Sequence, residues 1–300
     1  MKPRASDLLL TAIAPAIWGS TYIVTTEFLP DYSPMTVAML RALPAGLLLL
    51  LIVRQFPAGI WWLRIFILGA LNFSIFWSML FVSAYRLPGG VAATVGAVQP
   101  LIVIFLAAAM LGNRIRPASV LAAMIGLGGV ALLVLTPQAA LDPVGIAAGL
   151  AGAVSMAFGT VLTRKWQPTV SLLTFTAWQL TAGGLLLMPM ALLVEPTVPV
   201  PTIPNLLGLF WLGLIGAALT YILWFRGIAR LDSAVVSSLG FLSPVTAVLL
   251  GWSFLGQTLT ALQIVGVVLV IGSIWLGQRP NRNSKPLSRE GDPASAGSKT

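Results

Sequence analysis

The sequence contains no cysteine and no histidine in its 300 residues. Without cysteine there are no disulfides and no thiol nucleophile, and without histidine every catalytic triad that needs an imidazole is excluded. Zinc sites built from these two residue types are excluded as well. Most enzyme classes are excluded with them, and since no paired carboxylates are evident either, we expect a protein that is not an enzyme and that holds no metal and no cofactor.

Charged residues are also scarce. They make up 8% of the chain, whereas hydrophobic residues make up 58%. A water-soluble domain carries about a quarter charged residues, so this composition excludes an ordinary soluble fold. The chain is predicted to be an all-α integral membrane protein, with the lipid bilayer as its main partner.

Ten runs of mainly apolar residues are long enough to form membrane-spanning helices, each of which needs roughly 20 residues. The connections between these runs are short and leave no room for a soluble domain. We expect ten transmembrane helices, at about 6–28, 34–53, 61–83, 89–111, 118–135, 144–164, 170–193, 206–226, 233–255 and 259–277.

The 17 basic residues outnumber the 8 acidic ones, and their placement indicates membrane topology rather than nucleic-acid binding. With the N-terminus inside, 15 of the 17 fall on one side of the membrane. The positive-inside rule therefore predicts a multi-pass protein with both termini in the cytoplasm. The polar segment 281–300 has almost nothing apolar to bury and is predicted to be a disordered cytoplasmic tail.

An internal repeat divides the chain. Residues 86–100 recur as residues 230–244, at a constant offset of 144 and without a gap. Each half has five predicted spans, an odd number, so the second half must enter the membrane from the opposite side. We therefore predict two inverted five-helix repeats, residues 1–140 and 141–280, around a central cavity, which is the usual plan of secondary transporters.

Pro100 and Pro244 occupy equivalent positions near the centres of their predicted spans. Proline removes the hydrogen bond to the carbonyl four residues earlier, here Gly96 and Gly240, so each helix is expected to kink and to serve as a gating element. Freed carbonyls are tolerated in a membrane where they face protein or cavity water. A purely structural kink is equally compatible with the sequence.

These motifs are similar to those of the drug/metabolite transporter superfamily, EamA-type branch, and most of all to its YddG-type aromatic amino acid exporters. The resemblance covers all ten spans and rests on Trp18-Gly19-Ser20, on Arg41 and on the two Gly-x-x-x-Pro helices. It implies an exporter or exchanger of small metabolites in the cell inner membrane, with the fifth and tenth helices peripheral. Asn113 and Gln257 stand where many relatives have a glutamate, so no role of that carboxylate carries over.

Polar and aromatic side chains at midplane depth are the candidates for substrate contact. Amide and hydroxyl groups can pair with the ammonium and carboxylate of an amino acid, and aromatic rings can cover its side chain or attract its cation. The candidates come from eight predicted helices and are Trp18, Tyr22, Asn72, Phe76, Trp77, Thr94, Gln99, Ser155, Phe158, Trp178, Gln179, Tyr221, Trp224, Ser237 and Ser243.

Arg41 is the one basic residue that falls well inside a predicted span. Charges inside a membrane are costly enough to suggest a function. One interpretation is that Arg41 attracts a substrate carboxylate. The other, equally supported, is that it snorkels to the interface or pairs with Glu27 or Asp31.

The leading prediction is a transporter of small amphipathic metabolites, amino acids first and aromatic ones in particular, that works by alternating access. A carrier of another cargo, such as a cationic drug, a nucleoside or a nucleotide sugar, shares every scaffold feature. A channel fits less well because no selectivity-filter-like loop is present, and a structural membrane protein would not need so many polar groups at midplane depth. The sequence specifies no oligomeric state, and a monomer is compatible with it.

Overall fold

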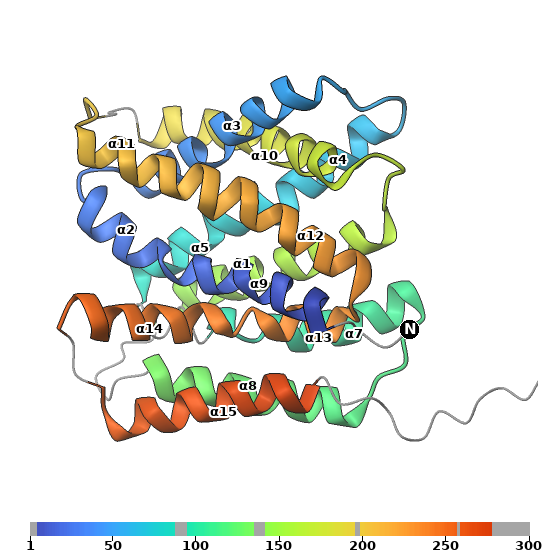
Figure 1. Ribbon diagram of the computed structural model, residues 1–300, viewed down its shortest axis with the longest axis vertical. Coiled ribbons are helices and arrows are strands. Elements are labelled where there is room, and N and C mark those ends of the chain that lie inside the picture. The colour runs from blue at the N-terminus through green and yellow to red at the C-terminus, as the bar shows by residue number, and fades with distance from the viewer. Residues whose placement is uncertain (1–4, 88–94, 135–141, 196–198, 257–258, 278–300) are drawn as a thin grey trace, which may run out of the picture.

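The computed structural model describes residues 5–87, 95–134, 142–195, 199–256 and 259–277, so the tail predicted at 281–300 lies outside the described residues. Within these ranges all regular secondary structure is helical, and the helices run side by side through the molecule (Figure 1). The α-helices are α1 Ala5–Gly19, α2 Thr21–Phe28, α3 Pro34–Val53, α4 Trp61–Gly69, α5 Ile75–Arg86, α7 Gln99–Leu111, α8 Pro117–Val134, α9 Pro143–Lys165, α10 Leu172–Val194, α11 Ile203–Phe210, α12 Thr220–Arg230, α13 Ser233–Leu239, α14 Leu242–Phe254 and α15 Ala261–Gly277. Two π-helices, η1 Ala70–Ser74 and η2 Trp211–Leu219, join α4 to α5 and α11 to α12.

Six helical stretches are long and apolar enough to cross a membrane: Pro34–Val53, Trp61–Ser83, Pro143–Lys165, Leu172–Val194, Ile203–Arg230 and Ser233–Phe254. Shorter apolar helices lie at Ala5–Gly19, Gln99–Leu111, Pro117–Leu133 and Ala261–Gly277. Large apolar side chains such as Leu51, Leu193 and Ile271 are exposed on the outside, where a soluble protein would carry polar groups. The all-helical membrane class is therefore confirmed, whereas the count of ten crossings stays a prediction.

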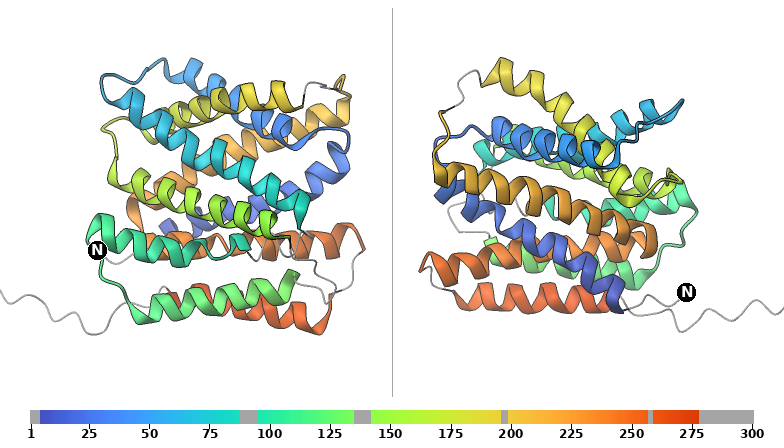
Figure 2. Two further views of the ribbon diagram at one scale, coloured as in Figure 1. Left: turned by 180° about the vertical axis from the view of Figure 1, so that it is seen from behind. Right: turned by 45° about the horizontal axis from the view of Figure 1, so that its top comes forward.

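The helices pack in a regular set of pairs. α3 lies against α10, and α8 lies against α15 at one edge of the molecule (Figures 1 and 2). Helix α9 packs against α5 and α7, and α1 packs against α12 and α14. Elements from the two halves of the chain thus interleave throughout the core.

Three predicted spans are interrupted rather than continuous. The first breaks at Ser20, between α1 and α2, and residues 97–98 form a turn just before α7. A turn at Gly240 and Phe241 separates α13 from α14 in the same way. Pro100 and Pro244 therefore lie in the first turns of α7 and α14, where proline's missing N–H is tolerated, and the helices are broken rather than kinked at an interior proline.

The two π-helices occupy equivalent places in the two halves. Adding 144 to the residue numbers of η1 gives 214–218, which lie inside η2. A π-helix inserts an extra residue into a turn, shifts the hydrogen-bond register and is frequent at functional sites. The two spans Trp61–Ser83 and Ile203–Arg230, related by the repeat, therefore carry the same local irregularity.

Close helix packing depends on glycine at defined positions. A Cβ atom added to Gly19 of α1 would lie 2.5 Å from the carbonyl oxygen of Ser243 and 2.6 Å from Cβ of Thr246, both in α14. At Gly46 of α3 an added Cβ would lie 2.5 Å from the backbone nitrogen of Thr181 in α10. Small residues let helix backbones approach in this way inside membranes.

Candidate functional site

Five aromatic side chains pack against one another where α1, η1, α5 and α12 meet. We call them the aromatic cluster: Trp18, Phe73, Trp77, Tyr221 and Trp224. The ring centroid of Trp18 lies 5.1 Å from those of both Tyr221 and Trp224, which is within the range of favourable ring contacts. Four of these five side chains were singled out from the sequence. The fifth, Phe73, was not.

Phe73 is the member of the cluster that sequence reasoning missed. Its ring centroid is 4.6 Å from that of Tyr221 and 5.3 Å from that of Trp77. Trp77 and Tyr221 are related by the 144-residue offset, so Phe73 lies between two repeat-related side chains. The available signal was its four-residue spacing to Trp77, which puts both on one helix face.

The carbonyl of Gly216 links the cluster to its surroundings. At the end of η2 the N–H of Thr220 bonds to the carbonyls of Ala217 and Ile215, and not to Gly216, the acceptor it would use in an α-helix. The Gly216 oxygen instead accepts hydrogen bonds from Trp18 Nε1 at 3.2 Å, Arg41 Nη2 at 2.6 Å and Thr220 Oγ1 at 2.8 Å. One backbone oxygen therefore gathers side chains from α1, α3 and α12.

Arg41 is buried, with 8% of its surface exposed. Its guanidinium carbon lies 4.9 Å from the ring centroid of Trp77, in a cation–π contact. Within the described residues Nε has no hydrogen-bond partner, and no ion pair joins Arg41 to Glu27, Asp31 or any other carboxylate. The guanidinium therefore faces the aromatic cluster, and the pairing with Glu27 or Asp31 that the sequence left open is not formed.

A second set of polar contacts lies beside the cluster. Asn72 Nδ2 in η1 donates to Gln179 Oε1 at 2.8 Å and to Thr163 Oγ1 at 3.1 Å. Ser155 Oγ donates to the carbonyl of Leu71 at 2.9 Å. These bonds tie η1 to α9 and α10 and so fix the position of the π-helix that carries Phe73. Three of these side chains were predicted, and Thr163 was not, because it lies close to the end of its span.

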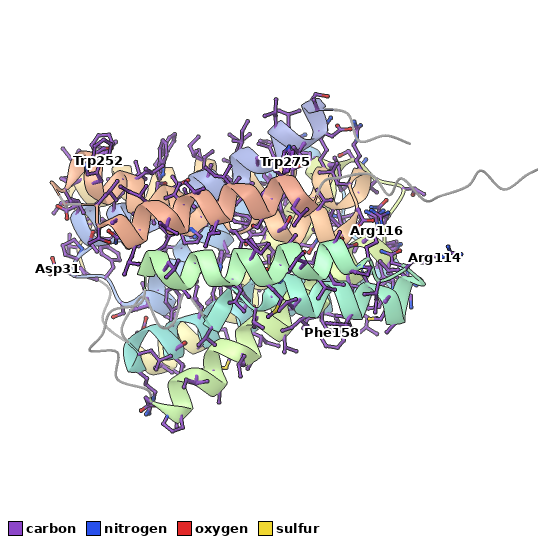
Figure 3. The ribbon with its side chains drawn as sticks, turned by 90° about the horizontal axis from the view of Figure 1, so that it is seen from below. Asp31, Arg114, Arg116, Phe158, Trp252 and Trp275 are labelled. Carbon is purple, nitrogen blue, oxygen red and sulfur yellow. The ribbon has the colours of Figure 1, made fainter. Side chains whose placement is uncertain are left out.

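Several predicted residues lie elsewhere. Phe158 is exposed on the outer surface of α9 (Figure 3). Trp178 Nε1 donates to the carbonyl of Gln55 at 2.6 Å, and this bond holds the segment that follows α3. Ser237 Oγ donates to the carbonyl of Ala234 within its own helix.

Within the described residues, the other candidates form no hydrogen bond to the aromatic cluster. Phe76 packs at the edge of the same core, and the carbonyl of Ser243 lies against Gly19. Gln99 has a buried Nε2 without a partner in the described part of the chain. Thr94 and the side chain of Tyr22 lie outside the described residues.

Different contacts hold the two ends of the molecule. Figure 3 shows Asp31 at one end and Arg114 and Arg116 at the other. The second end, which we call the arginine-rich end, carries Arg114 and Arg116 and, next to Asp232 and at the end of α12, also Arg164, Arg226 and Arg230. There Arg164 donates to the carbonyls of Ile228 and Leu231. At the opposite end Glu195 accepts from the backbone nitrogens of Met35 and Thr36 at 3.2 and 2.8 Å, which caps the N-terminus of α3.

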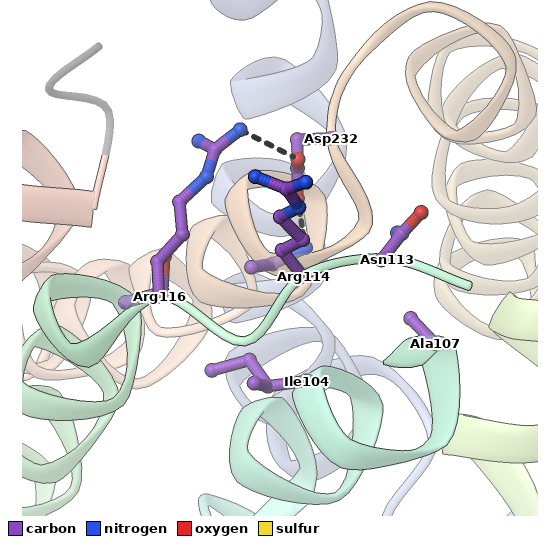
Figure 4. A pocket seen from close by; sticks show the side chains of 8 residues that line it. Ile104, Ala107, Asn113, Arg114, Arg116 and Asp232 are labelled. Atoms are coloured by element: carbon purple, nitrogen blue, oxygen red, sulfur yellow. Dashed lines mark hydrogen bonds and ion pairs between the residues drawn. The ribbon is translucent and has the colours of Figure 1, made fainter. Parts of the chain in front are cut away.

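A shallow pocket at the arginine-rich end surrounds the ion pair between Arg116 and Asp232, whose charged atoms are 3.7 Å apart (Figure 4). Both side chains are well exposed, so the pair contributes little to stability. Asn113, where many relatives have glutamate, lines this pocket, and Gln257 lies outside the described residues. The pocket thus borders the connection between α7 and α8, away from the aromatic cluster.

Among the described side chains, no group of three or more Asp, Glu, His or Cys residues is placed to hold a metal ion. The arrangement offers ring faces, hydroxyls, amides and one buried guanidinium. Groups of these kinds are suited to binding and orienting a small molecule, and they include no nucleophile paired with a base.

The model of one transporter family matches two separate ranges of the chain. The EamA-like transporter family covers residues 6–135 and residues 143–277. This chain belongs to the EamA-like transporter family. The resemblance drawn from Trp18-Gly19-Ser20, Arg41 and the Gly-x-x-x-Pro helices is therefore confirmed.

Three relatives illustrate the family. Protein PecM of Dickeya dadantii is 46% identical over 267 residues, which are 88% of this chain and 90% of that protein. The uncharacterized inner membrane transporter YedA of Escherichia coli is 28% identical and covers 87% of this chain and 86% of its own length. A probable amino-acid metabolite efflux pump of Salmonella typhimurium is 24% identical and covers 90% of this chain and 94% of its own length.

The fold is shared with a known crystal structure. That structure superimposes with a TM-score of 0.78 at 22% sequence identity, over 91% of this chain and 98% of its own. At that identity the likeness concerns the fold alone. The family match and the names of its members identify this EamA protein as a multi-pass membrane transporter of small metabolites and not an enzyme.

Proposed function

We propose that this EamA protein is a secondary transporter that exports small amphipathic metabolites, amino acids first and aromatic amino acids in particular. The observation that carries the proposal is the aromatic cluster joined to Arg41 through the carbonyl of Gly216. Rings of this kind cover an aromatic side chain, and the guanidinium complements a carboxylate. The similarity to a probable amino-acid metabolite efflux pump supports the same cargo.

The cluster is made by both halves of the chain. Trp18, Phe73 and Trp77 come from the first half, and Tyr221 and Trp224 come from the second. A site built between two halves opens to one side or the other when the halves rock, which is how alternating access works. In this conformation the rings contact one another, so one half has to move before a substrate can enter.

We assign residues 1–140 and 141–280 to two inverted repeats around this central site. The two separate family matches support the division. The helix pairs support a pseudo-two-fold axis, because exchanging the halves turns the α9–α5 and α9–α7 pairs into α1–α12 and α1–α14. The α3–α10 and α8–α15 pairs map onto themselves under the same exchange.

We place the protein in the cell inner membrane with ten crossings. Both termini and the arginine-rich end then face the cytoplasm. The separation of Arg114 and Arg116 from Asp31 (Figure 3) supports this orientation, since basic residues gather on the cytoplasmic side. The inner membrane transporter YedA supports the location.

Counterflow into proteoliposomes tests the function. Vesicles are loaded with unlabelled tryptophan, phenylalanine, methionine, threonine or lysine, and the entry of labelled tryptophan is followed after dilution. We expect uptake that depends on the internal amino acid and that is strongest with internal tryptophan or phenylalanine. Vesicles without protein provide the background.

A second preparation, with a known amino acid carrier in the same lipid, shows that the vesicles are sealed. If that carrier exchanges tryptophan and this protein exchanges no amino acid, the amino acid proposal is wrong. Nucleosides, sugars and cationic drugs are then the cargoes to screen, because the family assignment would stand.

A further inference from the structure

We propose that Arg41 makes this site selective for the carboxylate of its substrate, and that the ammonium group is dispensable. The substrate class is then small aromatic carboxylates, of which aromatic amino acids are one kind. This inference rests on the proposed transport function and adds which charged group of the substrate is recognised.

The first step concerns charge balance around the cluster. Each carboxylate in the described part of the chain lies at or near a helix end: Asp7, Glu27, Asp31, Asp142, Glu195 and Asp232. None of them forms an ion pair with Arg41. The site therefore holds a buried positive charge without a counter-ion, which is costly until an anion neutralises it.

The second step concerns hydrogen-bond donors without partners. Arg41 Nε and Trp224 Nε1 are buried and have no partner within the described residues. Trp224 belongs to the cluster and is 2% exposed. Both atoms are donors, so they fit a ligand group that only accepts hydrogen bonds, as a carboxylate does. An ammonium group only donates and would leave both atoms unpaired.

The third step explains how Arg41 is released to a substrate. The Gly216 oxygen accepts from Arg41, but it also accepts from Trp18 and Thr220. If the guanidinium turns to a carboxylate, the Gly216 oxygen keeps two donors. The exchange therefore leaves no backbone acceptor unpaired and replaces a neutral acceptor with a charged one, which forms the stronger bond.

Equilibrium binding to the purified protein in detergent tests this assignment. The probes are labelled indole-3-acetate, which carries only the carboxylate, tryptophan, which carries both charges, and tryptamine, which carries only the ammonium. All three share the indole ring, so differences between them report the charged groups. We expect indole-3-acetate to bind at least as tightly as tryptophan and tryptamine to bind at least about tenfold more weakly, since a charge-assisted bond is lost.

Variants of Arg41 separate recognition from structure. Arg41→Gln is expected to weaken indole-3-acetate binding by about 10- to 100-fold, the loss expected for one charge-assisted hydrogen bond. Arg41→Lys keeps the charge and is expected to keep the preference for carboxylate over amine. Arg64→Gln is the matched control, because Arg64 also stacks over tryptophan, 5.1 Å from the ring centroid of Trp61, but lies outside the cluster. It is expected to bind all three probes as the unaltered protein does.

Two results would overturn the inference: tryptamine binding as tightly as indole-3-acetate, or an Arg41→Gln protein with unchanged ranking of the probes. If Arg41→Gln does not fold, the inference is tested by the order of the three probe affinities in the unaltered protein and in Arg41→Lys. Counterflow on the same preparation separates this inference from the transport proposal. Tryptophan exchange without a carboxylate preference refutes the role of Arg41 alone, whereas carboxylate binding without any exchange refutes the transport proposal.

Discussion

The carboxylate of Asp7 in α1 lies 2.5 Å from the guanidinium of Arg226 in α12, and Arg230 approaches the same oxygen at 3.3 Å. The side chains of Asp7 and Arg226 are 11% and 20% exposed. This ion pair therefore joins the two halves of the chain in a partly buried position at the arginine-rich end.

Replacing Asp7 with Asn is expected to destabilise the protein. Hydrogen bonds to charged groups contribute about 1.5–3 kcal/mol, so we expect a loss of about 2 kcal/mol, seen as a lower melting temperature in detergent. Asp142→Asn is the control, because its ion pair with Arg86 is longer, at 3.6 Å, and more exposed. Exposed pairs contribute about 0–1 kcal/mol, and equal losses in both variants would contradict the assigned role of Asp7.

Gly19 is expected to tolerate no larger side chain. In Gly19→Ala the new methyl group meets the backbone of α14, and overpacking of this kind costs about 1–3 kcal/mol. Gly128→Ala is the matched control, because an added Cβ there meets nothing within 4 Å. Alanine is also the better helix former by about 1 kcal/mol, so Gly128→Ala should melt at the same or a higher temperature. A Gly19→Ala protein as stable as that control would show that α1 and α14 do not need this close contact.

The aromatic cluster is expected to determine substrate affinity. Trp77→Ala and Tyr221→Ala should each reduce tryptophan counterflow at least about tenfold, because 1.4 kcal/mol of lost ring contact corresponds to that factor. Trp252→Ala removes an outward-facing tryptophan that is 52% exposed (Figure 3) and should leave counterflow unchanged. Size-exclusion profiles verify that each variant is folded. Loss of activity in Trp252→Ala but not in Trp77→Ala would place the binding site elsewhere.

The aromatic side chains of this site, apart from Phe73, were predictable from the sequence. Large rings at midplane depth are conspicuous, and the 144-residue offset related Trp77 to Tyr221. The role of the Gly216 carbonyl as an acceptor for side chains could not be predicted. It is a backbone group, and it lacks its α-helical partner only because of the hydrogen-bond register of η2. The packing around a helix sets that register, and no side-chain pattern of residues 211–219 indicates it.

The position of Phe158 shows where the reasoning from depth alone fails. Leu150, Val154 and Phe158 are all exposed and recur every fourth residue, so they form one stripe on α9. The remaining positions of α9 are mostly small and buried against neighbouring helices. This stripe of large apolar residues among small ones indicates from the sequence that Phe158 faces lipid. Its depth in the span led to the opposite prediction.

The central claim is that one site is reached alternately from both sides of the membrane. The absence of cysteine from the sequence allows a direct measurement, because a single introduced thiol is then the only one in the protein. Thr220 is fully buried next to Trp18 and Gly216, and Thr220→Cys changes its size little. An Asn113→Cys protein, altered at the arginine-rich end, serves as the one-sided control.

The measurement is the rate at which a membrane-impermeant maleimide modifies Thr220→Cys in right-side-out and in inside-out vesicles. The account predicts modification in both preparations, with saturating tryptophan slowing it in each, whereas the Asn113→Cys control reacts in inside-out vesicles only. Modification of Thr220→Cys from one side alone, or from neither side while the control reacts, would contradict alternating access to this site.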